Sequence, residues 1–321
     1  MRSSVTGAPG SGADGPEVSV VMGVYDCASA LSRTLDSVLS EAGLRLEVIV
    51  VDDGSTDGSG DLVDRYARTD GRVTVVHEDN RGLTQALIRG CALARGEFVA
   101  RQDVGDVSLP GRLRKQRECL ESRSEAVFVS CGTRVVGPGG EHLYDVLSDE
   151  SEVTRALRSL DAARPRGPAH HGTVMFRRAA YEKVGGYRAE FYFAQDLDLW
   201  VRLAEVGDHA VLPEILYQAV AAPGSISGTY RREQVVLTRL IAESARRRRA
   251  GASDADVLAR AAAIRPSGPP RAGRLARSRA LYFIGACLGR RRDPAAMRYL
   301  LEAIRENPLH LKAWCRLLRA G

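Results

Sequence analysis

The sequence predicts an α/β fold in which a mostly parallel, Rossmann-like sheet is flanked by helices and followed by a basic α-helical C-terminal extension. Apolar, β-branched runs alternate with segments of helical periodicity through the first two thirds of the 321 residues, and such alternation is typical of parallel sheets. The run at residues 48–51 leads directly into two carboxylates and a glycine turn, as expected of a strand buried on both faces. The last third of the chain is helical in pattern and rich in arginine.

The expected strands and helices follow one another in a regular order. Short apolar runs predict strands at residues 18–24, 46–51, 73–77, 96–100 and 127–130, and a further strand directly after His170 and His171. Apolar residues spaced three and four apart predict helices at residues 31–39, 62–66, 83–94 and 111–122, and another from Leu199 onward. Glycines at residues 82, 185 and 186 mark turns between them. Strands and helices alternating at this spacing predict a doubly wound sheet.

The two ends of the chain differ from this central part. Residues 1–16 are small, polar and glycine-rich, without the apolar core of a signal peptide, so we expect a disordered leader. Residues 17–230 are then the α/β domain and residues 231–321 a basic helical region. No apolar run reaches the length of a membrane-spanning helix. The six scattered cysteines show no Cys-x-x-Cys spacing and indicate a reduced, cytoplasmic protein.

The net charge of +6 combines two parts of opposite charge. Residues 231–321 carry 21 basic and 7 acidic side chains, whereas the rest of the chain carries 25 basic and 33 acidic ones. A basic region of this kind favours an anionic partner. We expect an anionic membrane surface, at the inner face of the plasma membrane, and no nucleic acid. The alternative is that these side chains form solvated helical faces.

Carboxylates cluster where predicted strands end and where a helix begins. The three pairs are Asp52 with Asp53, Asp103 with Asp106, and Asp196 with Asp198. Ligands of open α/β sheets bind at the carboxyl ends of the strands, so the first two pairs should share one cleft. Converging carboxylates repel one another unless they share a cation, and oxygen ligands suit Mg²⁺ or Mn²⁺ beside substrate phosphates. The chain has no P-loop motif, and no Gly-x-Gly-x-x-Gly follows its first strand.

Seven segments, taken in order, resemble the motifs of family 2 glycosyltransferases with the GT-A fold. They are residues 18–25 (VSVVMGVY), 50–59 (VVDDGSTDGS), 80–83 (NRGL), 94–103 (ARGEFVARQD), 108–113 (SLPGRL), 184–187 (VGGY) and 194–200 (AQDLDLW). Each segment is weak alone, but their order and spacing together are specific. The resemblance implies a GT-A-like sheet and inverting transfer of a sugar from a nucleotide-sugar donor. The expected acceptor is a glycan or a lipid-linked molecule in cell-surface polysaccharide synthesis.

The resemblance also implies which residues bind the donor and the metal. Asp53 or Asp52 would hydrogen-bond the nucleobase, and Tyr25 would flank it. Arg81 and Arg101 would supply positive charge on the donor side. Asp103 and Asp106 would bind Mg²⁺ or Mn²⁺, which would neutralise the leaving diphosphate.

On the acceptor side, the resemblance implies that Asp196 is the general base that deprotonates the attacking hydroxyl. His171 and Asp198 are expected nearby. Two departures from the family pattern matter. The usual Asp-x-Asp-Asp metal motif reads Asp-Val-Gly-Asp at residues 103–106, so Asp106 has to replace the lost middle ligand. The usual Glu-Asp pair at the base reads Gln195-Asp196.

Two other functions remain open at this point. The altered metal motif is compatible with a non-catalytic interaction protein that uses its basic helical tail as a binding module. A nucleotidyltransferase-like enzyme would need a basic phosphate loop after the first strand, but residues 25–32 contain no basic side chain. Donor hydrolysis by the purified protein would separate an enzyme from an interaction module.

Overall fold

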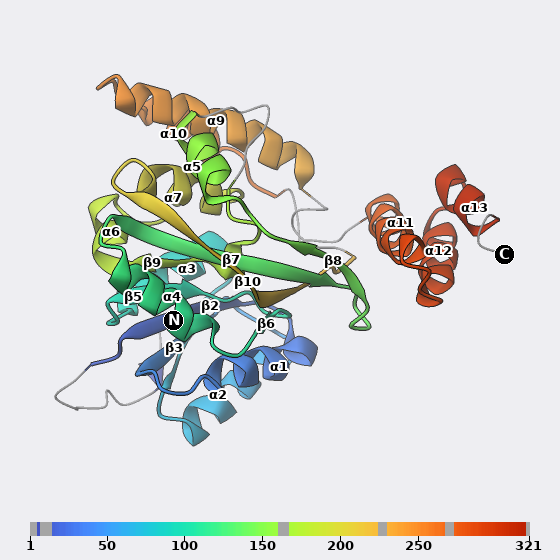
Figure 1. The fold of residues 1–321 in the computed structure, drawn as a ribbon, viewed down its shortest axis with the longest axis horizontal. Coiled ribbons are helices and arrows are strands. Elements are labelled where there is room, and N and C mark those ends of the chain that lie inside the picture. The colour runs from blue at the N-terminus through green and yellow to red at the C-terminus, as the bar shows by residue number, and fades with distance from the viewer. Residues whose placement is uncertain (1–4, 7–14, 160–166, 224–229, 267–272, 319–321) are drawn as a thin grey trace.

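A ten-stranded mixed sheet forms the centre of the protein, with helices on both of its faces and a group of three helices to one side (Figure 1). The computed structural model describes residues 5–6, 15–159, 167–223, 230–266 and 273–318. The strands are β1 Val5–Thr6, β2 Val18–Val24, β3 Leu46–Asp52, β4 Val73–His77, β5 Phe98–Arg101, β6 Val107–Ser108, β7 Ala126–Val136, β8 His142–Val146, β9 Met175–Arg177 and β10 Asp208–Val220.

The sheet has a parallel half and a mixed half. Its strand order is β1-β4-β3-β2-β5-β9-β7-β10-β6, and β8 pairs with β7 outside this path. Strand β2 runs parallel to β3 and β5, and β3 runs parallel to β4. Strand β9 is antiparallel to both β5 and β7, while β7 and β10 are parallel. The carboxyl ends of β2, β3 and β5 therefore meet at one edge of the sheet.

The helices are α1 Ala28–Leu39, α2 Ser59–Thr69, α3 Leu83–Leu93, α4 Arg112–Ser122, α5 Glu150–Ser159, α6 Arg178–Lys183, α7 Gln195–Leu203, α9 Arg231–Arg249, α10 Ala255–Ala262, α11 Arg274–Arg290, α12 Ala295–Glu306 and α13 Leu311–Leu317, with a 3-10 turn η1 at His171–Thr173. Helices α1 to α4 and α7 are found close to the positions that the sequence predicts, whereas α5 and α6 were not predicted. No helix in these described ranges is long and apolar enough to cross a membrane.

Successive residues of the central strands point to opposite faces of the sheet, so each face has its own hydrophobic core. In β2, Val21 packs with α3 and α7 on one face, whereas Val20 and Met22 pack with α1 and α4 on the other. Both faces are covered, which explains why the strands read as continuous apolar runs rather than alternating ones.

The core of the first face extends beyond the predicted domain boundary at residue 230. Leu237, Leu240 and Ile241 of α9, and Val257 of α10, are buried in the same cluster as Leu199 of α7. Helices α11 to α13 instead form a separate cluster with Leu143 of β8. Among the described residues, the change from one packed cluster to the other therefore lies between α10 and α11.

Four strands of the sheet, β1, β6, β8 and β10, were not expected from the sequence. Val5 and Thr6, assigned to a disordered leader, form β1 and pair with Val76 and Val75 of β4. This pairing covers the exposed backbone groups that an edge strand would otherwise present. Residues 1–4 and 7–14 of the leader lie outside the described residues.

Strand β10 is the longest of the strands that were not predicted. Its register against β7 shifts between Leu212 and Ile215, on either side of Pro213 and Glu214. A proline cannot donate to the ladder and is tolerated in a sheet at such irregular positions. Pro213 interrupts the apolar pattern of residues 208–220, so the sequence did not predict a strand there.

Candidate active site

The loop that follows β5 brings two carboxylates and a histidine together. Asp103 and Asp106 each place an Oδ2 atom 3.6 Å from Nδ1 of His170. The ligand atoms of these three residues all lie within 4.8 Å of one another. The sequence predicted the two aspartates at this position, and the structure adds His170 to them.

Asp103 is held from behind by Arg101. The guanidinium of Arg101 is fully buried and donates a 2.6 Å hydrogen bond to Asp103 Oδ1, besides bonds to the carbonyls of Val21 and Gln102. Burial alone would raise the pKa of the Asp103 carboxyl, but Arg101 and the nearby histidines outweigh it and lower that pKa. Asp103 is therefore held in its ionised form.

Asp106 is fixed by strand β10. The hydroxyl of Tyr217 donates to its Oδ2 atom at 3.0 Å, and the backbone N–H of Val220 donates to Oδ1 at 2.8 Å. Burial raises the pKa of Asp106 to about 6, and the charge of Asp103 adds to the effect of burial. Neutralising that repulsion is what a bound cation does in such a cluster.

The loop that carries His170 is held by another buried arginine. Arg112 is fully buried and donates to the carbonyls of Gly172 and Arg101, and its guanidinium lies 5.1 Å from the centre of the Tyr217 ring. A side chain at Gly172 would fall 1.9 Å from the Tyr217 hydroxyl, so this position has to be glycine. These contacts give the segment at residues 108–113 a structural role in the site.

Asp196 lies on the first turn of α7, close enough to Asp103 and His170 for their charges to act on its carboxyl. Its Oδ1 atom accepts from the N–H of Leu197 at 2.8 Å. Burial raises the pKa of this carboxyl, and the charge of Asp103 raises it further. Ala194, just before the helix, has φ of 58°, a left-handed conformation in which a non-glycine residue is strained and which often occurs at functional sites. A carboxylate with a raised pKa, set beside a cation-binding cluster, can act as a base.

Asp52 and Asp53 lie at the carboxyl end of β3, and both accept hydrogen bonds from the protein. Asp52 accepts from the N–H of Ser55 at 3.1 Å and lies 2.9 Å from Nδ1 of His77, so it anchors the turn. Asp53 accepts from the N–H groups of Arg81 and Gly82 at 2.7 and 2.8 Å. Each oxygen of Asp53 has a second lone pair for a ligand. Asp53 is therefore better placed than Asp52 for a nucleobase contact.

Two tyrosine rings, those of Tyr192 and Tyr25, lie near Asp53. The ring of Tyr192 lies so close to Gly82 that a side chain there would come within 2.4 Å of it. Asp53 and Tyr25 both raise the pKa of Tyr192, after the larger effect of burial. Tyr25 itself is 40% exposed, which leaves its ring free to flank a ligand. The sequence analysis did not identify Tyr192, because it lies far along the chain from Asp53 and Tyr25.

Two predicted site residues, Arg101 and His171, turn out to be buried in the interior. Arg101 was expected to contact the donor, but it is fully buried behind Asp103 and acts only through that residue. Arg81 contacts Asp53 through its backbone N–H, and its exposed side chain stays a predicted donor contact. His171 is buried, its Nε2 lies 2.8 Å from the Tyr187 hydroxyl, and burial lowers its pKa to about 3. His171 is therefore a neutral core residue, and its neighbour His170 takes the place in the site.

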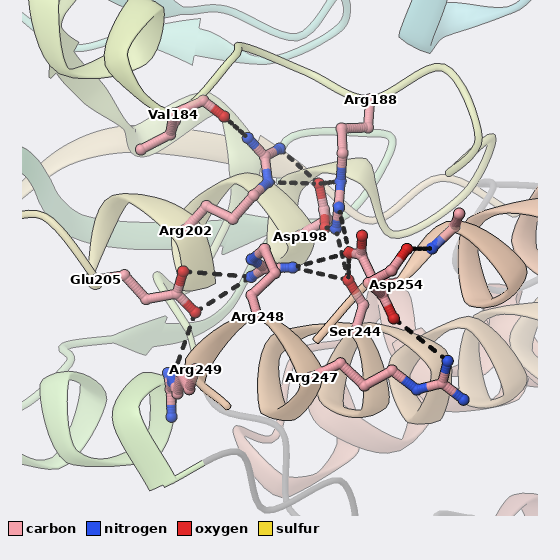
Figure 2. A network of polar contacts seen from close by, with 12 residues as sticks. Val184, Arg188, Asp198, Arg202, Glu205, Ser244, Arg247, Arg248, Arg249 and Asp254 are labelled. Atoms are coloured by element: carbon pink, nitrogen blue, oxygen red, sulfur yellow. Dashed lines mark hydrogen bonds and ion pairs between the residues drawn. The ribbon is translucent and has the colours of Figure 1, made fainter. Parts of the chain in front are cut away.

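Asp198 was expected near the acceptor, but it is the centre of a buried ion-pair network (Figure 2). Its carboxylate is 1% exposed and accepts from Nε of Arg188 at 3.0 Å and from Nε of Arg202 at 3.1 Å. Arg188 continues to Asp254 at 3.1 Å, which precedes α10. The network joins α7, and so the segment that carries Asp196, to helices α9 and α10.

His170, Tyr217 and Arg112 are the main site residues that sequence reasoning missed. The pair of histidines at residues 170–171 was a usable signal, but the chain alone does not show which of the two faces the carboxylates. Tyr217 is on a strand that was not predicted. Arg112 was part of a recognised segment without an assigned role.

The fold and the acidic cleft define a class, the GT-A-type glycosyltransferase domain. Residues 19–185 match the family described as Glycosyl transferase family 2. The putative glycosyltransferase EpsE of Bacillus subtilis is 34% identical over 209 residues, which cover 64% of this chain and 73% of EpsE. The chain therefore belongs to glycosyl transferase family 2.

More distant relatives agree with this assignment. The chondroitin synthase of Pasteurella multocida is 27% identical over 211 residues, but the chain spans only 20% of its length. Among solved structures, a mannosyltransferase of Pyrobaculum calidifontis in complex with GDP-Man and Mn²⁺ has a TM-score of 0.56 at 22% identity, covering 96% of this chain and 86% of that one. TarS of S. aureus in complex with UDP has a TM-score of 0.51 at 16% identity, covering 95% and 88%. These structures support the GT-A fold.

Proposed function

We propose that this glycosyltransferase transfers a hexose-type sugar, with inversion, from a nucleotide-sugar donor to a glycan or lipid-linked acceptor. The observation that carries the proposal is that Asp196, on the first turn of α7, lies close enough to Asp103 and His170 for their charges to act on its carboxyl. An inverting transfer needs a base on the acceptor side and positive charge on the leaving group, and this cleft offers a place for both.

The chain's own residues account for the proton transfer. Asp196 takes the proton of the acceptor hydroxyl. The hydroxyl oxygen then bonds to the anomeric carbon of the donor sugar, while the bond from that carbon to the nucleoside diphosphate breaks. The raised pKa of Asp196 makes it a stronger base than an ordinary aspartate. Asp53 and Tyr25 hold the nucleobase, with Tyr192 as the neighbouring wall.

We further propose that Asp103, Asp106 and His170 hold a divalent cation. The donor set fits, because two carboxylate oxygens and an imidazole nitrogen converge within 4.8 Å. A nitrogen ligand favours Mn²⁺ over Mg²⁺, since magnesium prefers oxygen ligands. When bound, the cation neutralises charge on the departing diphosphate. The Mn²⁺ in the mannosyltransferase complex is consistent with this proposal.

The acceptor and the location are proposed on the relatives' names and on the charge of the chain. A chondroitin synthase and a hyaluronan synthase of Pasteurella multocida are among the relatives, which favours a role in cell-surface polysaccharide synthesis. The basic C-terminal region favours a peripheral position on the inner face of the plasma membrane.

A panel of nucleoside diphosphates and sugar nucleotides, with and without Mn²⁺, tests the proposed function. A ligand that binds only the native state raises the melting temperature, so GDP or UDP with Mn²⁺ should stabilise the protein and the matching sugar nucleotide should be hydrolysed. Asp196→Asn should keep the thermal shift and lose the hydrolysis. A protein that binds no nucleotide under any of these conditions would instead be an interaction module.

A further inference from the structure

Helices α11, α12 and α13 form a small bundle that is attached to the catalytic domain through the β7–β8 hairpin (Figure 1). Arg298 and Tyr299 of α12 both bond to Glu141, and the Tyr144 ring packs edge-on against Phe283 at 6.1 Å. The bundle is therefore fixed to the domain, and its remaining surface faces away from the sheet.

The outer surface of α13 carries large apolar side chains that no described helix covers. The exposed fractions are 83% for Leu309, 74% for Leu311, 42% for Trp314 and 78% for Leu318. Leu311 also lines a hollow of about 820 Å³, together with Met297 of α12. Contiguous exposed apolar surface of this kind marks an interaction site.

Basic side chains surround this apolar surface. Arg292, Lys312 and Arg316 line the same hollow, Arg290 is the last residue of α11, and Arg291 directly follows that helix. Within the described part of the chain, none of the five forms an ion pair. Three arginines of α9, Arg247, Arg248 and Arg249, are instead held by Glu243, Asp256, Asp254 and Glu205. The five basic side chains beside the apolar surface are therefore available to an anionic partner.

We propose that this surface of α11–α13, defined by Leu309, Leu311, Trp314 and Leu318 and the five basic side chains around them, docks on an anionic lipid membrane. Residues 273–318 carry ten basic and three acidic side chains, so two copies of the bundle repel each other and a second copy is not the occupant. The exposed leucines and a tryptophan beside arginines suit the boundary between lipid headgroups and acyl chains. The inference rests on the proposed membrane location and names the surface responsible for it.

Sedimentation of the full-length protein with vesicles tests this docking. The protein should pellet with phosphatidylcholine vesicles that contain phosphatidylserine, release at high salt, and ignore pure phosphatidylcholine. The triple variant R290E/R291E/R292E should bind anionic vesicles about tenfold more weakly or worse. The matched control R231E/R232E/R239E changes the net charge equally, through exposed arginines of α9, and should bind like the parent. If both variants lost vesicle binding equally, the binding would come from the overall positive charge of the protein and not from this surface, and the proposal would be overturned.

Fluorescence tests the apolar part of the surface independently. Trp314 is exposed and the other tryptophan, Trp200, is buried, so anionic vesicles should shift the emission to shorter wavelength in the parent and not in Trp314→Phe. The variant L311S/L318S alters only exposed side chains and should lose vesicle binding too. No shift and no pelleting of the parent would overturn the proposal. Nucleotide-induced stabilisation, measured in the same variants, shows separately whether the catalytic proposal holds.

Discussion

At the residue scale, Asp196 is the side chain on which the proposed chemistry depends. Replacing it by asparagine keeps the shape of the cleft and removes the base, so turnover should fall by about 10²–10⁴, while nucleotide binding stays within a few-fold. Single-turnover assays and titration calorimetry measure the two effects. Near-normal turnover in a folded Asp196→Asn protein would show that another group takes the proton.

The raised pKa of Asp196 also predicts a pH dependence. A base works in its deprotonated form, so kcat should fall as the pH drops through the pKa of Asp196. Because burial and Asp103 raise that pKa, this fall should occur at a higher pH than the value of about 3.9 for a free aspartate. A kcat that stays constant down to that value would argue against Asp196 as the base.

His170 provides a test of the metal cluster. His170→Ala removes one of three converging ligands and should weaken apparent Mn²⁺ affinity at least about tenfold, as read from activation curves. His142→Ala, which alters an exposed histidine on β8, is the control. Asp103→Ala should lose more activity than Asp106→Ala, and full activity in excess EDTA would refute the metal role.

Gly105→Asp, which would restore the usual aspartate of the metal motif, is a less suitable test of the metal site. Gly105 has φ of 96°, a conformation that favours glycine strongly. Gly105→Asp would therefore strain the loop even though space is open around it.

At the scale of secondary-structure elements, the Asp198 network determines how α7 is held. Removing one partner of a buried ion pair leaves an uncompensated charge and typically destabilises a protein by about 3–5 kcal/mol. Arg188→Leu should therefore lower the free energy of unfolding far more than Arg178→Leu, whose pair with Glu182 is on the surface. Urea denaturation compares the two variants, and equal losses would contradict the role of the network.

The same network predicts how acid affects stability. Burial alone would raise the pKa of Asp198, but Arg202 and Arg188 outweigh it and the pKa is lowered. The stabilisation is present above the unfolded-state pKa, about 3.9, and is lost as the pH falls through the folded-state value. Asp198→Asn should therefore reduce this acid dependence.

At the scale of the whole molecule, the division of the chain can be tested by truncation. We propose that the catalytic unit extends to about residue 266, because α9 and α10 share the core of α7. A chain ending at residue 266 should fold and respond to nucleotides, but lose vesicle binding. A chain ending at residue 230 should unfold or melt at a much lower temperature. If the chain ending at residue 230 were instead stable, the domain boundary at residue 230 predicted from the sequence would be correct.

The sequence by itself determined the parallel half of the sheet and the acids at its edge. Strands β2 to β5 lie where the apolar runs predicted them, because a strand buried on both faces must be apolar along its whole length. The carboxyl ends of parallel strands share an edge, so Asp53 and Asp103 could be placed at one edge of the sheet from local pattern alone.

Only the tertiary structure decided what each polar side chain does. Tyr217 reaches Asp106 across 111 positions of the chain, and His170, not His171, meets the two aspartates. Arg101 and Asp198 have the residue types of a binding site but are turned into the interior, where they pair with Asp103 and Arg188. Local pattern reports the direction of a strand or a helix, whereas a partner for a buried charge is set by the packing of distant elements.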